Sequence, residues 1–124
     1  MRVRVEAPCR PTESLAKVER ALLNLFPDLA FEREDDLVIG TTASLERLRE
    51  LFRDQRIRDS ARSQLLKGRA GDRTRVLLNK QAAFVGRVNF STGSPLGDIS
   101  VEIQADDLAA VIDYVAESTV GAAR

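Results

Sequence analysis

The sequence predicts an α+β fold in which helices pack on one largely antiparallel sheet. Short segments in which apolar and polar residues alternate are interspersed with longer segments that have apolar residues at helical spacing. Several of the alternating segments are joined by short polar turns, which favours hairpins over parallel crossovers. The chain has 124 residues, 44% of them hydrophobic, which is enough for one domain with its own core.

The first predicted elements are a strand and a helix. Residues 2–8 alternate apolar and charged side chains, as a half-buried strand does. Residues 10–28 carry apolar residues at helical spacing, with Thr12 as the predicted N-cap, Glu13 in the first turn and Pro27 as the stop.

A hairpin and a long helical region follow. Residues 29–33 and 37–41 are predicted to pair around an acidic turn. The helical region, residues 43–67, has two apolar faces about half a turn apart. Its two faces are Leu45, Leu48, Leu51 and Phe52, and then Ile57, Ala61 and Leu65. Because a straight helix cannot bury both faces against one sheet, we expect a kink or break between Arg53 and Ile57.

The segment LLNKQAAFVGRVNF, residues 77–90, joins two apolar runs through Asn79, Lys80 and Gln81. A single strand of this length would be unusual. We therefore expect one strand in TRVLLN and another in FVGRVNF, residues 84–90, joined by KQAA in about one helical turn.

The remainder predicts a strand in ISVEIQ and a last helix capped by Asp106. The predicted order is βαββαβββα. The predicted domain spans residues 1–117, and residues 118–124 are expected to form a flexible tail.

Composition excludes several kinds of chemistry. The chain contains no histidine and one cysteine, Cys9, which rules out imidazole catalysis, zinc sites of cysteine and histidine, and an internal disulfide. No apolar run is long enough to span a membrane. The sequence predicts a cytoplasmic protein with no cofactor and no metal.

Charge is distributed unevenly although the formal net charge is zero. Residues 43–87 hold twelve basic and five acidic residues, whereas residues 88–124 hold one basic and six acidic residues. Such asymmetry can mark a surface for an anionic partner. Two alternatives remain open: a solvated face, and self-association in which the basic middle of one copy meets an acidic segment of another.

Seven residues are candidates for contacts with nucleic acid. Arginines bind phosphate oxygens bidentately, which suits RNA. The candidates are Arg56, Arg58, Arg62, Asn79, Lys80, Gln81 and Arg87. For the two amides the alternative is that they satisfy backbone groups where the strand ends, with Lys80 solvated. Arg87 has its own alternative, which is to pair with a carboxylate.

Acidic pairs offer a weaker signal. Asp35–Asp36 and Asp106–Asp107 raise the possibility of a magnesium site or acid–base chemistry. A hairpin turn and a helix start account for them respectively. A carboxylate-dependent enzyme is therefore the third alternative.

Three segments resemble a family of conserved archaeal proteins associated with RNA binding. They are QRIRDSARSQLLKG, LLNKQAAFVGRVNF and SPLGDISVEI. The resemblance covers nearly the whole chain. It implies an archaeal source, and a fold like that of the large-subunit ribosomal protein that binds 5S ribosomal RNA. The favoured hypothesis is a non-enzymatic protein that contacts structured RNA through phosphates; the main alternative is a self-association module, with a homo-oligomer as its product.

Overall fold

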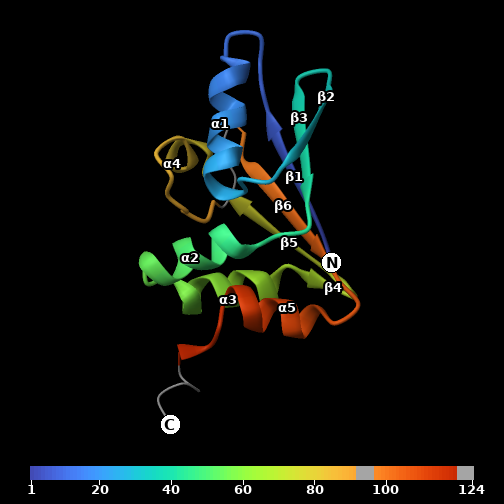
Figure 1. Ribbon diagram of the computed structural model, residues 1–124, viewed down its shortest axis with the longest axis vertical. Coiled ribbons are helices and arrows are strands. Elements are labelled where there is room, and N and C mark those ends of the chain that lie inside the picture. Colours follow the sequence, from blue (N-terminus) through green and yellow to red (C-terminus); the bar gives the residue numbers. More distant parts are fainter. Residues whose placement is uncertain (92–96, 120–124) are drawn as a thin grey trace.

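In the computed structural model, which describes residues 1–91 and 97–119, six strands form one sheet (Figure 1). The strands are β1 (Arg2–Pro8), β2 (Ala30–Glu34), β3 (Leu37–Thr42), β4 (Arg69–Ala70), β5 (Arg73–Leu78) and β6 (Ile99–Gln104). The helices are α1 (Leu15–Leu25), α2 (Glu46–Asp54), α3 (Arg58–Lys67), α4 (Lys80–Phe84) and α5 (Leu108–Val115). The order is β2-β3-β1-β6-β5-β4 and every neighbouring pair is antiparallel. The predicted α+β class is confirmed.

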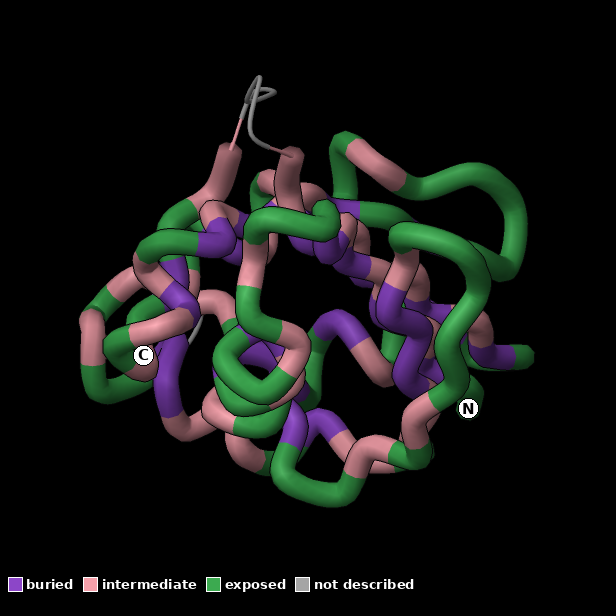
Figure 2. Tube along the Cα trace, turned by 90° about the horizontal axis from the view of Figure 1, so that it is seen from above, coloured by how far each residue is buried: buried purple, intermediate pink, exposed green. Residues whose placement is uncertain are grey.

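The core lies between one face of the sheet and the helices. Side chains of β1 and β6 alternate strictly, so that Val3, Val5, Val101 and Ile103 are fully buried while their neighbours are not. Figure 2 shows the buried segments toward the middle of the molecule. Since the helices pack on this face alone, the sheet has a second face that no described helix covers.

The predicted break in the long helical region is confirmed. Helix α2 ends at Asp54 and α3 begins at Arg58. Between them Arg56 has a φ of 58°, the left-handed conformation. This residue turns the chain so that both apolar faces reach the core, with Phe52 and Leu65 each 1% exposed.

The predicted strand over residues 84–90 is wrong. After β5, Asn79 caps α4 by accepting a hydrogen bond from the Ala82 amide at 2.8 Å. The helix ends at Phe84, and Gly86, which follows its C-cap Val85, has a φ of 73°. There the amides of Gly86 and Arg87 donate to the carbonyls of Ala83 and Ala82, the bond pattern of a Schellman motif. The helical turn at KQAA was predicted. The end of the helix at Phe84, with Gly86 after it, lies where the second strand was expected and was not predicted.

Only the end of the predicted second strand pairs with β5. Phe90 forms an isolated bridge with Leu78. The bridge is flanked by hydrogen bonds from the Asn79 amide to the Asn89 carbonyl at 2.8 Å and from the Ser91 amide to the Leu77 carbonyl at 2.9 Å. The segment therefore leaves the sheet, forms one helical turn and returns to the same strand.

Smaller corrections concern helix starts. Ser14, not Thr12, caps α1, and Glu13 lies before the helix rather than in its first turn. Asp107, not Asp106, caps α5. In each case a second polar residue nearby satisfies the same requirement, and sequence alone does not choose between them.

Part of the predicted tail lies outside the described residues. Within the described part, the amide and hydroxyl of Thr119 both donate to the carboxylate of Asp59 in α3. These bonds hold the pKa of Asp59 below its ordinary value. The extent of the domain and the flexibility of residues 118–124 remain predictions.

Gly68 allows α3 to end against β5. A Cβ at this position would lie 2.1 Å from the backbone carbonyl oxygen of Arg75. We expect Gly68→Ala to lower the free energy of unfolding by about 2 kcal/mol, because strand or helix must shift. Ser63→Ala, at an exposed position of the same helix, is the control and should be nearly neutral. Equal stability of both variants by chemical denaturation would contradict this packing argument.

Candidate nucleic-acid interface

The arginines of α2 and α3 are mostly engaged within the chain. Arg47 pairs with Glu50 and Arg53 with Asp54. Arg49 donates from Nε to the carbonyl of Tyr114 at 2.9 Å, and its guanidinium lies 5.1 Å from the centre of that ring. The sequence pattern on these helices therefore does not translate into a surface of unpaired positive charge.

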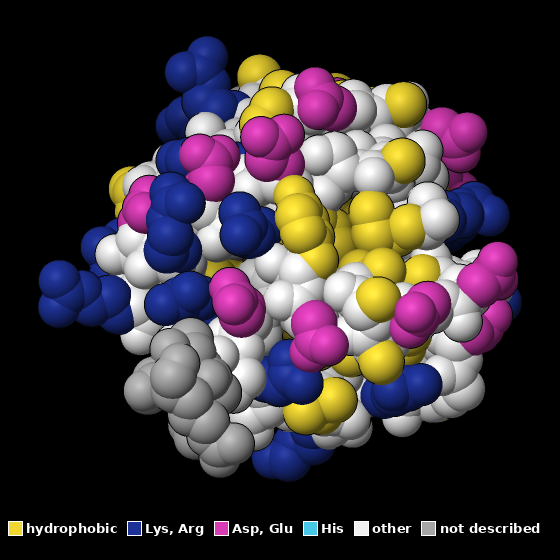
Figure 3. All heavy atoms as spheres, turned by 60° about the horizontal axis from the view of Figure 1, so that its bottom comes forward, with side chains coloured by type: hydrophobic (Ala, Val, Ile, Leu, Met, Phe, Trp, Pro, Cys, Tyr) yellow, Lys and Arg dark blue, Asp and Glu magenta, His cyan; other side chains and the backbone are white. Residues whose placement is uncertain are grey.

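The acidic end of the chain supplies carboxylates to α3. Arg58 Nη1 lies 3.9 Å from Glu117 Oε2, and Arg62 Nη1 lies 2.5 Å from Asp113 Oδ1. Figure 3 shows basic and acidic side chains side by side on this end of the molecule, around a group of hydrophobic side chains. Two of the seven candidates are thus paired inside the chain by residues of α5 and the segment after it.

Two further candidates have structural roles. Asn79 is the cap of α4. Lys80 is only 4% exposed, and its Nζ donates to the Pro8 carbonyl at 2.7 Å and to Glu13 Oε2 at 2.8 Å. Its ammonium thus joins the end of β1 and the segment before α1 to α4. In this position Lys80 does not face an external partner.

Three candidates remain: Arg56 between α2 and α3, Gln81 in α4, and Arg87 after α4. We call these three residues, together with the exposed Val85, the loop patch. The side-chain amide of Gln55 donates to the Val88 carbonyl at 3.0 Å and accepts from the Val88 amide at 2.8 Å. These reciprocal bonds join the loop that contains Arg56 to the segment that contains Arg87. Both arginines are exposed, and neither side chain bonds another described residue.

Within the loop patch, Val85 is 73% exposed and Gln81 is exposed at the start of α4. Non-glycine residues rarely adopt a positive φ, and such strain concentrates at functional sites. The φ of Arg56 is therefore a second reason, beside exposure, to consider this patch functional.

Sequence reasoning missed a second group of arginines, on the uncovered side of the sheet. We define the open face as the outward residues of three adjacent strands: Arg2, Arg4 and Glu6 of β1; Ser100, Glu102 and Gln104 of β6; and Arg73, Arg75 and Leu77 of β5. The signal in the sequence was that the two arginines of each strand, Arg2 and Arg4 in β1 and Arg73 and Arg75 in β5, are two residues apart and so point to the same face. That β6 brings these two strands together could not be read from spacing.

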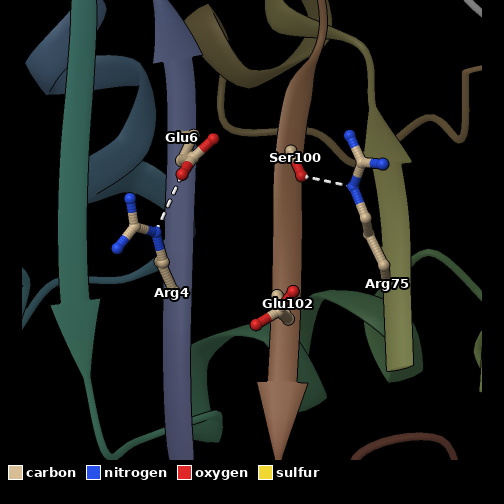
Figure 4. A pocket seen from close by; sticks show the side chains of 5 residues that line it. All are labelled: Arg4, Glu6, Arg75, Ser100 and Glu102. Atoms are coloured by element: carbon tan, nitrogen blue, oxygen red, sulfur yellow. Dashed lines mark hydrogen bonds and ion pairs between the residues drawn. The ribbon is translucent and has the colours of Figure 1, made fainter. Parts of the chain in front are cut away.

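Shallow depressions mark the open face. One, of about 360 Å³, is lined by Arg4, Glu6, Arg75, Ser100 and Glu102 (Figure 4). A second, of about 170 Å³, is lined by Arg2, Arg4, Arg73, Glu102 and Gln104.

Other kinds of site find no support in the described part of the chain. No group of three or more cysteine and acidic residues there could hold a metal ion. No helix in the same residues has the length and apolar character needed to cross a bilayer.

The architecture and surface define a small α+β domain with arginines exposed on two sides. A family model described as RNA binding matches residues 2–105, and the chain belongs to this family. Its relatives are archaeal UPF0201 proteins. Those of Thermococcus onnurineus and Methanothermobacter thermautotrophicus are each 47% identical, covering 94% and 93% of this chain and 92% and 90% of theirs.

Solved structures show the same relationship. A crystal structure of a UPF0201 protein matches with a TM-score of 0.90 and 39% identity, over 96% of this chain and 95% of that one. The UPF0201 protein from Methanococcus jannaschii, solved at 2.2 Å resolution, matches with a TM-score of 0.86 and 39% identity over the same shares. The family resemblance expected from the sequence is confirmed, and the likeness to the ribosomal protein remains a prediction.

The Lys80–Glu13 pair generates a pH-dependent prediction. The hydrogen bond from Lys80 holds the pKa of Glu13 below its ordinary value, with a smaller contribution from the Arg10 amide and an opposing one from burial. A depressed carboxyl pKa adds stability above the unfolded pKa, and this stability is lost as pH falls through the folded pKa. We expect Glu13→Gln to lower the free energy of unfolding by about 2 kcal/mol at pH 7.

The difference between wild type and Glu13→Gln should shrink below about pH 4.5, the ordinary pKa of the side chain. Asp54→Asn, which breaks a pair whose side chains are 54% and 59% exposed, serves as the control and should have little effect. Denaturation curves between pH 3 and 7 measure both variants. A difference that does not vary with pH would refute the coupling.

Proposed function

We propose that the protein binds structured RNA, without catalysing a reaction, through arginines directed at backbone phosphates. The loop patch carries this proposal, because Arg56 and Arg87 are exposed, adjacent and unpaired among the described residues. Membership of a family whose model is described as RNA binding supports it. Arginine forks match phosphate geometry and remain charged at all physiological pH values.

The other candidates fit this proposal unequally. Gln81 offers an exposed amide at the start of α4, the helix that Arg87 follows, and such an amide suits a ribose or base edge. Arg58 and Arg62 reach a phosphate only when they release Glu117 and Asp113. Asn79 and Lys80 stabilise the fold instead: Asn79 caps α4, and Lys80 bonds α4 to the end of β1.

Self-association is the alternative that charge asymmetry allowed. It required the basic middle of one copy to meet an acidic segment of another. The described ion pairs of Arg58 and Arg62 satisfy part of this complementarity within one chain. The test below also separates the two hypotheses.

Replacing Arg56 and Arg87 together by Ala should weaken binding to a long RNA hairpin. The logarithm of affinity falls linearly with the logarithm of salt concentration, and we expect the double variant to lower this slope by about two. The control double variant, Lys17→Ala with Arg20→Ala, removes two exposed charges from α1 and should change the slope less. No binding by the wild type at low salt would refute the function. An oligomer that the double variant dissociates would favour self-association.

Arg56→Gly should separate stability from binding. Glycine adopts a positive φ without the steric cost that an arginine bears, so the free energy of unfolding should rise by up to about 1 kcal/mol. RNA affinity should fall, because one phosphate contact is lost. Arg56→Lys keeps the charge and should retain most of the salt slope. If Arg56→Gly binds RNA as tightly as the wild type, Arg56 makes no contact.

A further inference from the structure

The open face is built differently from the loop patch, because hydrogen bonds hold two of its arginines, Arg4 and Arg75. Arg4 and Arg75 flank Glu102 in register across β1, β6 and β5, and Arg2 and Arg73 flank Gln104. From strand geometry, the arginines of each such pair have Cα atoms about 10 Å apart, and the two pairs lie about 7 Å apart along the strands. The Cα atoms of the four arginines thus form a rectangle on this face.

The hydrogen bonds of Arg4 and Arg75 leave the outer ends of both side chains available. Arg4 Nε donates to Glu6 Oε1 at 2.8 Å, and Arg75 Nε donates to Ser100 Oγ at 2.8 Å. Figure 4 shows both bonds, with the terminal nitrogens of each guanidinium directed away from the bond. Fixing the side chain through Nε lowers the conformational entropy lost when the two Nη atoms bind an anion.

The charge of this face is positive. Its four arginines outnumber its two carboxylates, and among the described residues Glu102 has one long contact with an arginine, from Arg73 Nη1 at 3.7 Å. Arg4 pairs with Glu6, and Arg73 also lies 3.9 Å from Asp72. Within the described part of the chain, no carboxylate forms an ion pair with Arg2 or Arg75, whereas each of the two candidate arginines of α3 has an acidic partner. An extended anion complements the open face better than a single small one, because the cations lie along two strands.

The chemistry of the open face selects among nucleic acids. None of its nine residues is aromatic, whereas proteins that hold unpaired bases commonly stack them on aromatic side chains. Base-paired RNA presents phosphates and 2′-hydroxyls while its bases stay stacked inside the helix. Ser100, Gln104 and the arginines supply hydrogen-bond donors for such groups.

We infer that the open face is a second RNA-binding surface, which seats the sugar–phosphate backbone of base-paired RNA. Arg2, Arg4, Arg73 and Arg75 contact phosphates, and Ser100 orients Arg75. This inference rests on the proposed RNA-binding function but concerns a surface on the opposite side of the sheet from the helices. The two surfaces act independently because they share no residue or bond.

The test compares two double variants. The open-face variant carries Arg4→Ala and Arg75→Ala, and the α1 variant, which is the control, carries Lys17→Ala and Arg20→Ala. The probes are a blunt RNA duplex and one of its strands alone, each titrated over a salt series. We expect the open-face variant to lose roughly sixty-fold in duplex affinity at 0.1 M salt, since each phosphate contact contributes about 0.9 to the slope. The α1 variant should retain duplex affinity, and the open-face variant should lose less on the single strand.

Two single variants test the roles of individual residues. Glu102→Gln removes the carboxylate between Arg4 and Arg75 and should raise duplex affinity severalfold, a gain that misfolding cannot produce. Ser100→Ala should weaken duplex binding while leaving the salt slope unchanged, because it frees Arg75 without removing its charge.

Outcomes distinguish this inference from the proposed function. If the wild type binds neither probe, both the proposed function and this inference are refuted. If it binds the duplex and only the loop-patch variant weakens binding, the open face is not an RNA surface and the proposed function stands. If the open-face variant leaves duplex affinity intact and alters sedimentation instead, the face joins two copies of the chain and the inference is overturned. Additive losses when both double variants are combined would support two independent surfaces.

Discussion

Alternation along the three adjacent strands β1, β6 and β5 is the constraint on which the rest of the structure depends. Because successive side chains point to opposite faces, each apolar residue that enters the core places its neighbours on the other side. Val3, Val5, Val101 and Ile103 fix the helices on one face. The same register brings the arginines of β1 and β5 to either side of β6, so that the core and the open face are specified together.

Sequence analysis succeeded where the deciding interactions are local. The break near Arg56 followed from the phase of apolar residues, since any helix that buries both Phe52 and Leu65 must change direction. Its failure after Asn79 has an equally local origin. Phe and Val at 84–90 favour a strand by composition, but Gly86 permits a left-handed helix end that competes with it.

The candidate site was harder to predict because an arginine or lysine takes its role from distant partners. Lys80 is buried because Pro8 and Glu13 lie beside it, more than sixty residues earlier in the chain. Arg62 is paired because α5 packs on α3. No sequence pattern within residues 43–87 predicts the burial of Lys80 or the pairing of Arg62, because the partners lie outside that segment. Arg56 and Arg87 were identified from sequence, whereas their adjacency depends on the Gln55–Val88 bonds, which no spacing rule encodes.

The carboxylates that α5 and its following segment place on α3 act as tethered competitors of any external anion. Asp113 and Glu117 belong to the same molecule as Arg62 and Arg58, so their effective concentration is high and independent of dilution. A phosphate would have to displace them to reach these arginines. Replacing these two acids would leave Arg58 and Arg62 without these partners, and so raise the net positive charge of this part of the surface without changing one basic residue.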